Sequence, residues 1–253
     1  MELRSQKAVG AFVIIMFAAP AAFPQQQFRY EAWHRHSRPP LVGKSRAAGT
    51  LLITDEGISF AETGKNGKEP AHKWHWAYEE IQQLELFPKH MRLLTYQDDK
   101  WKLGADRRYR FDGDFTGAYP LLKARLGNRL VAALPIKDLK AEWEIPVKHL
   151  LRFGGTHGVL RFGEDQVAYI TDKEDDMRIW SYSDIESVSS SDPYQLTITT
   201  YEKAALHYGN RKSFNFQLKK RLDEARYNRL HRKINQAQGL QILETYHERN
   251  TEE

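Results

Sequence analysis

One six-residue pattern occurs twice in this 253-residue chain and limits its possible folds more than any other feature. Residues 76–81 read WAYEEI and residues 180–185 read WSYSDI, so both follow the pattern W-x-Y-x-[DE]-I. Aromatic residues at alternating strand positions are expected to pack in a core rather than to form a recognition surface. The recurrence therefore predicts one module built twice.

Apolar residues around the two copies also match at a nearly constant offset. The offset is 109 at the start, where Leu51 corresponds to Leu160, and 104 or 105 from the repeated motif onwards. The second copy is therefore five residues shorter, most simply in the loop matching residues 63–71. A length change confined to a loop is typical of a duplicated fold. The sequence predicts modules at residues 41–131 and 148–238.

Composition supports a globular protein and excludes some kinds of chemistry. With 41% hydrophobic and 28% charged residues, the chain has enough apolar content for two cores. The formal net charge of +5 is too small to demand a nucleic-acid partner, and we predict none. The chain has no cysteine, which excludes disulfides, thiolate metal ligands and a thiol nucleophile.

The N-terminus has the pattern of a secretory signal. Arg4 and Lys7 precede an uncharged stretch, residues 8–24, in which the small residues 19–22 suit a signal peptidase. We expect residues 1–22 to be a signal peptide and the mature protein to be exported, to the periplasm or outside the cell. The alternative is an uncleaved membrane anchor, because 17 uncharged residues reach the short limit for crossing a bilayer.

Three further stretches lie outside the modules. They are a lead-in at residues 23–40, a linker at residues 132–147 and a C-terminal tail at residues 239–253. Proline and turn-forming residues mark the first two stretches. Trp143 in the linker is expected to be buried between the modules or against the second one.

Each module is expected to consist of short strands followed by one helix. Alternating apolar residues separated by turn sequences predict about seven strands in the first module. The period then becomes helical, from Tyr119 or Pro120 to Leu130, because proline is tolerated in a first helical turn. Asp112 and Asp114 just before it are candidate helix caps.

This order of elements resembles GRAM and bacterial pleckstrin-homology-like (PH-like) domains. The sequence G-x-L-x-I, which opens the expected first strand at residues 49–53, and the repeated W-x-Y-x-[DE]-I near the third support the resemblance, which covers both modules. It implies a mainly β fold with α: two tandem, seven-stranded, partly open barrels, each closed by one C-terminal amphipathic helix. It also implies modules that bind lipids or proteins without catalysis.

The chain departs from the family at the place where its phosphoinositide-binding members usually bind. Those members use basic residues around the first hairpin. Here the turns expected for the first hairpin, residues 55–57 (DEG) and 163–165 (GED), are acidic and would repel a phosphate. We therefore expect no phosphoinositide recognition at these turns.

Several histidines and carboxylates are candidate metal ligands: His34 and His36, His72 and His75, and the acids of residues 112–114 and 172–176. The first pair has no third ligand nearby and is interpreted as surface histidines of a flexible arm. The second pair is three residues apart on a predicted strand and points to opposite faces. The two acidic groups lack the calcium-loop spacing and are interpreted as a helix cap and a solvated loop. We predict no metal and no cofactor.

Catalytic motifs are missing from the sequence. It contains no G-x-S-x-G, no H-E-x-x-H and no glycine-rich phosphate loop. We therefore predict that the protein is not an enzyme, while a site assembled from residues distant in sequence stays open.

The strongest local charge lies in residues 211–233, with nine basic residues against two acidic ones. A basic helix from Lys219 to Lys233 would suit anionic lipid headgroups or another acidic envelope polymer. The alternative is a solvated helix face whose apolar side plugs the barrel; that side would consist of Leu222, Ala225, Leu230 and Ile234. The candidate contact residues are Lys219, Lys220, Arg226, Arg229 and Lys233.

These observations favour an exported, non-catalytic binding or scaffold protein of the bacterial cell envelope. Its partner would be an envelope protein. A peripheral binder of anionic membrane surfaces, acting through the basic helix of the second module, is the first alternative. An envelope hydrolase whose site is not visible in the sequence is the second.

Overall fold

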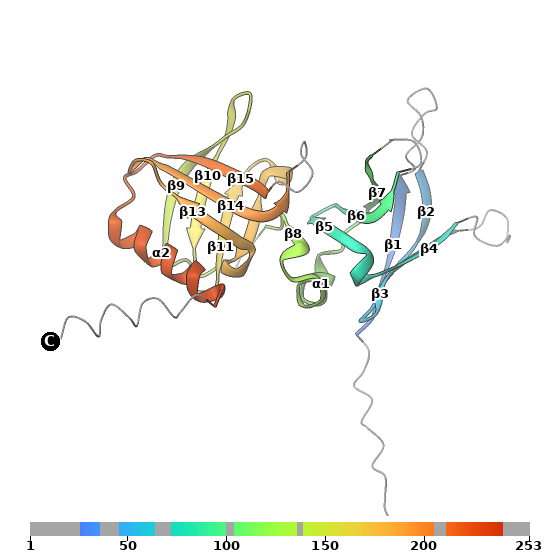
Figure 1. Cartoon of the computed structure of the whole chain (residues 1–253). Coiled ribbons are helices and arrows are strands. Elements are labelled where there is room, and N and C mark those ends of the chain that lie inside the picture. The colour runs from blue at the N-terminus through green and yellow to red at the C-terminus, as the bar shows by residue number, and fades with distance from the viewer. Residues whose placement is uncertain are drawn as a thin grey trace, which may run out of the picture.

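The computed structural model describes residues 26–35, 46–63, 72–99, 104–135, 139–204 and 211–239. The predicted signal peptide, the tail after Gly239 and most of the loop expected at residues 63–71 lie outside these ranges. The fold is mainly β with α, as the sequence predicts: in these ranges fifteen strands form one sheet accompanied by two α-helices (Figure 1). Within the described ranges, no helix is long and apolar enough to cross a membrane.

We call residues 28–132 the N-terminal unit. Its strands and helices are β1 (Phe28–Arg35), β2 (Arg46–Ile53), β3 (Gly57–Glu62), β4 (Lys73–Ala77), η2 (Tyr78–Glu80), β5 (Ile81–Phe87), β6 (His90–Asp98), β7 (Asp106–Asp112), η3 (Thr116–Ala118), α1 (Tyr119–Leu126), η4 (Gly127–Arg129) and β8 (Leu130–Ala132).

Residues 143–237 form the C-terminal unit. Its elements are β9 (Trp143–Leu150), β10 (Gly155–Phe162), β11 (Gln166–Thr171), η5 (Glu174–Asp176), β12 (Arg178–Ser181), η6 (Tyr182–Asp184), β13 (Ile185–Ser189), β14 (Gln195–Lys203), β15 (Arg211–Leu218) and α2 (Glu224–Ala237).

The strand order reads the same way in the two units. It is β5-β6-β7-β1-β2-β3-β4 in the N-terminal unit and β13-β14-β15-β9-β10-β11-β12 in the C-terminal unit. Neighbouring strands within each unit are antiparallel. Among the described strands β4 does not pair with β5, and β12 does not pair with β13, so each unit is a partly open barrel.

The short strand β8 joins the two units into one sheet. It pairs in parallel with β5, where Leu130 lies opposite Leu84, and antiparallel with β12, where Ala132 lies opposite Ile179. A strand between two barrel edges satisfies backbone groups on both sides. The units are therefore connected by main-chain pairing as well as by the chain itself.

The first strand of each unit corrects two predicted boundaries. Strand β1 lies within the predicted lead-in and pairs with β2 along its whole length. Strand β9 begins at Trp143, inside the predicted linker, and pairs with β10. Both strands were missed because their inward positions include Ala32, His34 and His149, which weaken the apolar alternation. As predicted, Trp143 packs against the second module, its ring 3.7 Å from that of Phe162.

The missed strands also change which hairpin comes first. The acidic turns at residues 55–57 and 163–165 connect β2 to β3 and β10 to β11, so they belong to the second hairpin of each unit. The first hairpin of the C-terminal unit turns at residues 151–154 instead, and its sequence is LRFG.

The repeated motif lies in the core of each unit, as predicted. Its tryptophan, tyrosine and isoleucine are each at most 7% exposed. The tyrosine hydroxyls donate to backbone oxygens, Tyr78 to Thr54 and Tyr182 to Gly163. Burial raises the pKa of Tyr78 to about 12. The motif is therefore part of the core and not a recognition surface.

The acid of the motif caps the turn in which it lies. Glu80 accepts the backbone N–H of Ala77 at 2.9 Å, and Asp184 accepts that of Ser181 at 2.9 Å. Each carboxylate thus reaches back three residues, as in a capping box. The acid fixes the bend between β4 and β5, and between β12 and β13.

The two helices differ from the prediction at their ends. Helix α1 begins at Tyr119, as expected, but ends at Leu126, so Leu130 belongs to β8. Helix α2 begins after its N-cap Asp223, so Lys219 and Lys220 precede it. Its buried residues are Leu230 and Ile234, which pack in the core with Leu222 and the half-buried Tyr227, whereas Ala225 is exposed.

Candidate functional site

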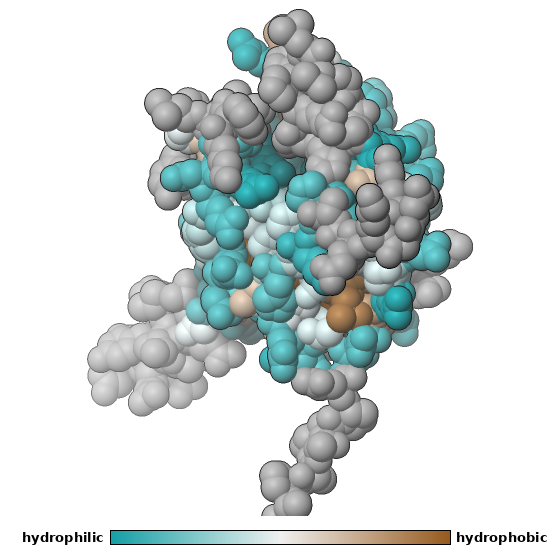
Figure 2. Space-filling view, turned by 90° about the vertical axis from the view of Figure 1, so that its right-hand side faces the viewer, coloured by the Kyte–Doolittle hydropathy of each residue, from teal (hydrophilic) through white to brown (hydrophobic). Residues whose placement is uncertain are grey.

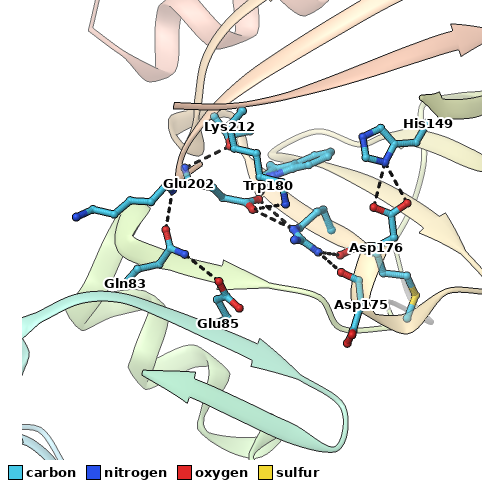
Figure 3. Close-up of polar contacts among 12 residues, drawn as sticks. Gln83, Glu85, His149, Asp175, Asp176, Trp180, Glu202 and Lys212 are labelled. Carbon is cyan, nitrogen blue, oxygen red and sulfur yellow. Dashed lines mark hydrogen bonds and ion pairs between the residues drawn. The ribbon is translucent and has the colours of Figure 1, made fainter. Parts of the chain in front are cut away.

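A buried charged cluster lies in the C-terminal unit on the side that faces the N-terminal unit (Figure 3). The carboxylate of Glu202 on β14 accepts from Arg178 Nε and from Trp180 Nε1, each at 3.1 Å. Lys212 Nζ lies 3.4 Å from its other oxygen. Glu202 and Arg178 are each only about 7% exposed or less. Because buried charges must be paired and hydrogen-bonded, these residues form a structural cluster.

A second cluster surrounds Asp176 in η5. His149 Nδ1 lies 3.0 Å from both carboxylate oxygens, and the Thr156 hydroxyl donates to the same carboxylate. Burial raises the pKa of Asp176, but the hydrogen bonds from His149 and Thr156 outweigh it and leave the pKa below its usual value. Histidine, hydroxyl and acid meet here, yet the hydroxyl bonds to the acid and not to the imidazole. Activation of a hydroxyl by histidine would need the opposite arrangement.

Polar contacts also cross between the units. We call these contacts the seam. From the N-terminal unit they involve Gln82, Gln83, Lys89, Arg92 and Lys123, and from the C-terminal unit Glu174, Asp175, Asp184 and Lys203. Lys123 Nζ lies 2.6 Å from Asp184, whose side chain is 9% exposed. The Gln83 side chain accepts the backbone N–H of Lys203 at 2.8 Å. The half-buried Lys123 pair and the pairing through β8 fix the relative orientation of the units.

His90 is a buried titratable group close to the seam. Its ring stacks on Phe87 at 4.3 Å and is 8% exposed, and its Nε2 has no hydrogen-bond partner among the described residues. Burial, together with the positive charges of Arg110 and Arg92, lowers its pKa to about 4, against the opposing effect of Asp175. The native protein therefore holds a neutral imidazole here at neutral pH.

This pKa predicts an acid-dependent loss of stability. The unfolded state binds a proton at His90 below about pH 6.5, whereas the native state does so only below about pH 4, so stability falls as the pH falls between these values. We expect about 2 kcal/mol of this loss to come from His90, after allowing for solvent screening. Urea unfolding of the wild type and of His90→Phe at pH 7.5 and pH 4.5 measures it. An equal loss in both proteins would contradict the assignment.

The predicted contact residues on the basic helix do not act as one free patch. Lys233 is held internally, because its ammonium group donates to Glu142 at 2.6 Å and to two backbone oxygens. Arg229 lies 3.9 Å from Glu142, and Arg226 lies 3.4 Å from Asp223. Lys219 and Lys220 are exposed in the connection before α2. Lys233 is therefore not available to a partner, whereas Lys219 and Lys220 before the helix, and the exposed Arg226 and Arg229 on it, lie at the surface.

Two of the histidine interpretations can be assessed in the structure. His34 is 5% exposed and stacks on Trp74, with Phe111 also in contact, so the interpretation as a surface histidine is wrong. His72 bonds Glu62, and His75 bonds Ser59. These two partners differ, as expected for opposite faces of a strand. His36 lies outside the described residues.

The two acidic groups agree only in part with the predicted roles. Asp112 is bound by three guanidinium groups, from Arg35, Arg46 and Arg110, and does not cap α1. Asp114 accepts from the N–H and hydroxyl of Thr116 and thus orders the turn before the helix. Of the acids of residues 172–176, Asp172, Glu174 and Asp175 are exposed, as expected of a solvated loop, whereas Asp176 is half-buried and bonds His149. Among the described residues no three potential metal ligands come together.

Sequence reasoning also missed an exposed apolar hairpin tip. The hairpin of β9 and β10 projects beyond the rest of the C-terminal unit (Figure 1). At its end Phe153 is 85% exposed, and Leu150 and Leu151 are 43% and 42% exposed. No acidic residue lies between Glu144 and Glu164. The predicted linker hid this hairpin, because it covered the first half of β9.

Comparisons with known proteins reveal only distant similarity. No protein-family model and no curated protein matches the chain. Among solved structures, the Spt16D–Pob3N heterodimer shares 10% identity at a TM-score of 0.30, covering 69% of this chain and 82% of that one. The hSac2 domain of human phosphoinositide phosphatase Sac2 shares 16% identity at a TM-score of 0.28, covering 46% and 82%. The description of the fold therefore rests on the strand order itself.

Proposed function

We propose that this chain is an exported, non-catalytic scaffold protein of the bacterial cell envelope, built from two tandem PH-like modules that act as one rigid unit. The observation that carries the proposal is the seam. Main-chain pairing through β8 and the half-buried pair of Lys123 and Asp184 hold the units in one orientation. A fixed orientation suits a protein that presents its surfaces to a partner, because little binding energy is then lost in ordering the two units.

The pairing of the buried polar groups supports a non-catalytic role. Glu202 is occupied by Arg178, Trp180 and Lys212. Asp176 is occupied by a histidine and a threonine in a pattern that does not activate the hydroxyl. Groups paired in this way stabilise the fold, which accounts for their burial without a catalytic role.

Cell fractionation combined with chemical crosslinking tests the proposal. We expect the full chain to be outside the cytoplasm and to crosslink into a species larger than itself at its normal abundance. Removal of residues 1–22 should keep the chain in the cytoplasm and abolish that species. A full chain that stays in the cytoplasm, or that crosslinks to nothing, would overturn the proposal.

A second candidate function is peripheral binding to an anionic membrane, and the hairpin tip favours it. Exposed Phe153, Leu150 and Leu151 beside Arg152, without acidic neighbours, suit the interface of a negatively charged bilayer. Sedimentation with phosphatidylglycerol vesicles at low salt measures this binding. Loss of binding in Phe153→Ser and in Lys219→Glu/Lys220→Glu would support it, whereas a wild-type chain that stays in solution would exclude it.

A further inference from the structure

The two units differ in what covers one edge of the barrel. In the C-terminal unit, β12 pairs with β11 on one side and with β8 on the other. The corresponding strand of the N-terminal unit is β4, which among the described strands pairs only with β3. An open strand edge presents unpaired N–H and C=O groups and is a template for another strand. The part of the chain that the structure describes thus contains an occupant for the β12 edge and none for the corresponding β4 edge.

The backbone directions of the two edges match. The Glu62 N–H donates to the His72 oxygen, so the even-numbered residues of β4 point their backbone groups at β3. The backbone groups of the odd-numbered residues, Lys73, His75 and Ala77, then point outward. In agreement, the Ala77 N–H donates to the Glu80 side chain and not to β3. At an offset of 104, His75 corresponds to Ile179, which is the residue that pairs with Ala132 of β8. The backbone N–H and C=O of His75 therefore point outward from β4 in the same way as those of Ile179, which pair with β8, point outward from β12.

We propose that the outer edge of β4 binds an extended segment of small apolar residues from a partner protein, added antiparallel as a further strand. This inference rests on the proposed scaffold function and specifies its partner. The chemistry of the occupant follows from β8, whose Leu130-Val131-Ala132 sequence occupies the matching edge. Small side chains let a strand approach an edge closely, and main-chain hydrogen bonds supply the affinity.

The surface around this edge is consistent with recognition through the main chain. Figure 2 faces the N-terminal unit, and the residues coloured there are mostly hydrophilic, with one compact hydrophobic patch. Apolar burial alone would hold a partner weakly on such a surface. The β8 strand of a second copy does not fit the role, because both of its edges are already paired, with β5 and with β12.

Titration of the full chain with a synthetic peptide of residues 128–134, NRLVAAL, tests the proposal by calorimetry. The key variant is His75→Pro, because proline removes only an outward N–H at this position. The matched control is His75→Ala, which loses the same bond to Ser59 but keeps the N–H. We expect His75→Ala to bind like the wild type and His75→Pro to bind at least tenfold more weakly.

A second measurement keeps the test valid if His75→Pro unfolds. A peptide N-methylated at the alanine that corresponds to Ala132 lacks the N–H that an added strand needs, and it should bind the wild type at least tenfold more weakly. Equal binding of both peptides, no binding, or binding unaffected by His75→Pro would overturn the edge site. A different result is a wild-type dimer that the His75→Pro substitution dissociates, while no peptide binds. That result would overturn the proposed partner and show that the edge pairs with a second copy of the chain. If the crosslinked envelope species persists in these cases, only the edge site fails and the scaffold function stands.

Discussion

Replacing Glu202 with alanine is expected to lower the free energy of unfolding by about 3–5 kcal/mol, the usual cost of removing one partner of a buried ion pair. The carboxylate is 7% exposed and compensates two cations, Arg178 and Lys212. Burial already lowers the pKa of Lys212, and the attraction of Glu202 opposes this effect. Without Glu202, Arg178 keeps only backbone acceptors, and Trp180 Nε1 loses its partner.

Urea unfolding followed by tryptophan fluorescence measures this effect. Glu144→Ala is the matched control, because Glu144 pairs with Arg161 at the same 3.1 Å but is 57% exposed, so its loss should cost less than 1 kcal/mol. The double variant Arg178→Met/Glu202→Met should recover part of the loss, because the charge of Arg178 is then not left without its partner, although Lys212 still loses Glu202. Equal effects of Glu202→Ala and Glu144→Ala would show that burial of the pair does not matter.

The core of the fold could be predicted because its signals repeat. The W-x-Y-x-[DE]-I motif combines large buried side chains with a capping acid, and each residue agrees with the same local structure. The strands β2, β3, β10 and β11 follow clear apolar alternation. By contrast, β1 carries Ala32 and His34, and β9 carries His149, at inward positions where the pattern needs a larger aliphatic residue, so periodicity alone could not find these strands.

The seam and the charged cluster were not predicted, although one signal was present. In residues 195–203 the inward positions are Leu196, Ile198, Thr200 and Glu202, so a carboxylate lies in phase with an apolar face. Such a residue must find a buried partner, and Arg178 lies two residues before Trp180 on the same face of β12. The pairing itself could not be predicted, because it joins strands distant in sequence.

The end of α1 explains why the two units are joined at all. Gly127 has φ 56° and ψ −124°, a conformation that residues with a Cβ rarely adopt. The helix therefore stops after Leu126 and the chain continues into β8. The corresponding residue of the C-terminal unit, at an offset of 104, is His231, and there α2 continues to Ala237. The presence of Gly127 thus accounts for the difference between the two helices. Helix α1 ends early and leads into β8, whereas α2 continues.

Gly127→Ala is accordingly expected to destabilise the protein by about 1–3 kcal/mol. No atom lies within 4 Å of the position that a Cβ would take, so the effect comes from the backbone and not from a steric clash. Because the strain acts at the start of the chain segment that forms β8, we also expect faster limited proteolysis between residues 126 and 143.

The matched control for Gly127→Ala is His231→Ala, at the corresponding position of α2. Its change in unfolding free energy should stay within about 0.5 kcal/mol, because alanine is a better helix former and the exposed His231 contacts Asn235 and the Tyr227 ring on its own helix. If Gly127→Ala unfolds at the same urea concentration as the wild type, the glycine is not what ends α1. If Gly127→Ala is destabilised but its rate of proteolysis between residues 126 and 143 is unchanged, β8 stays paired between the units without the glycine.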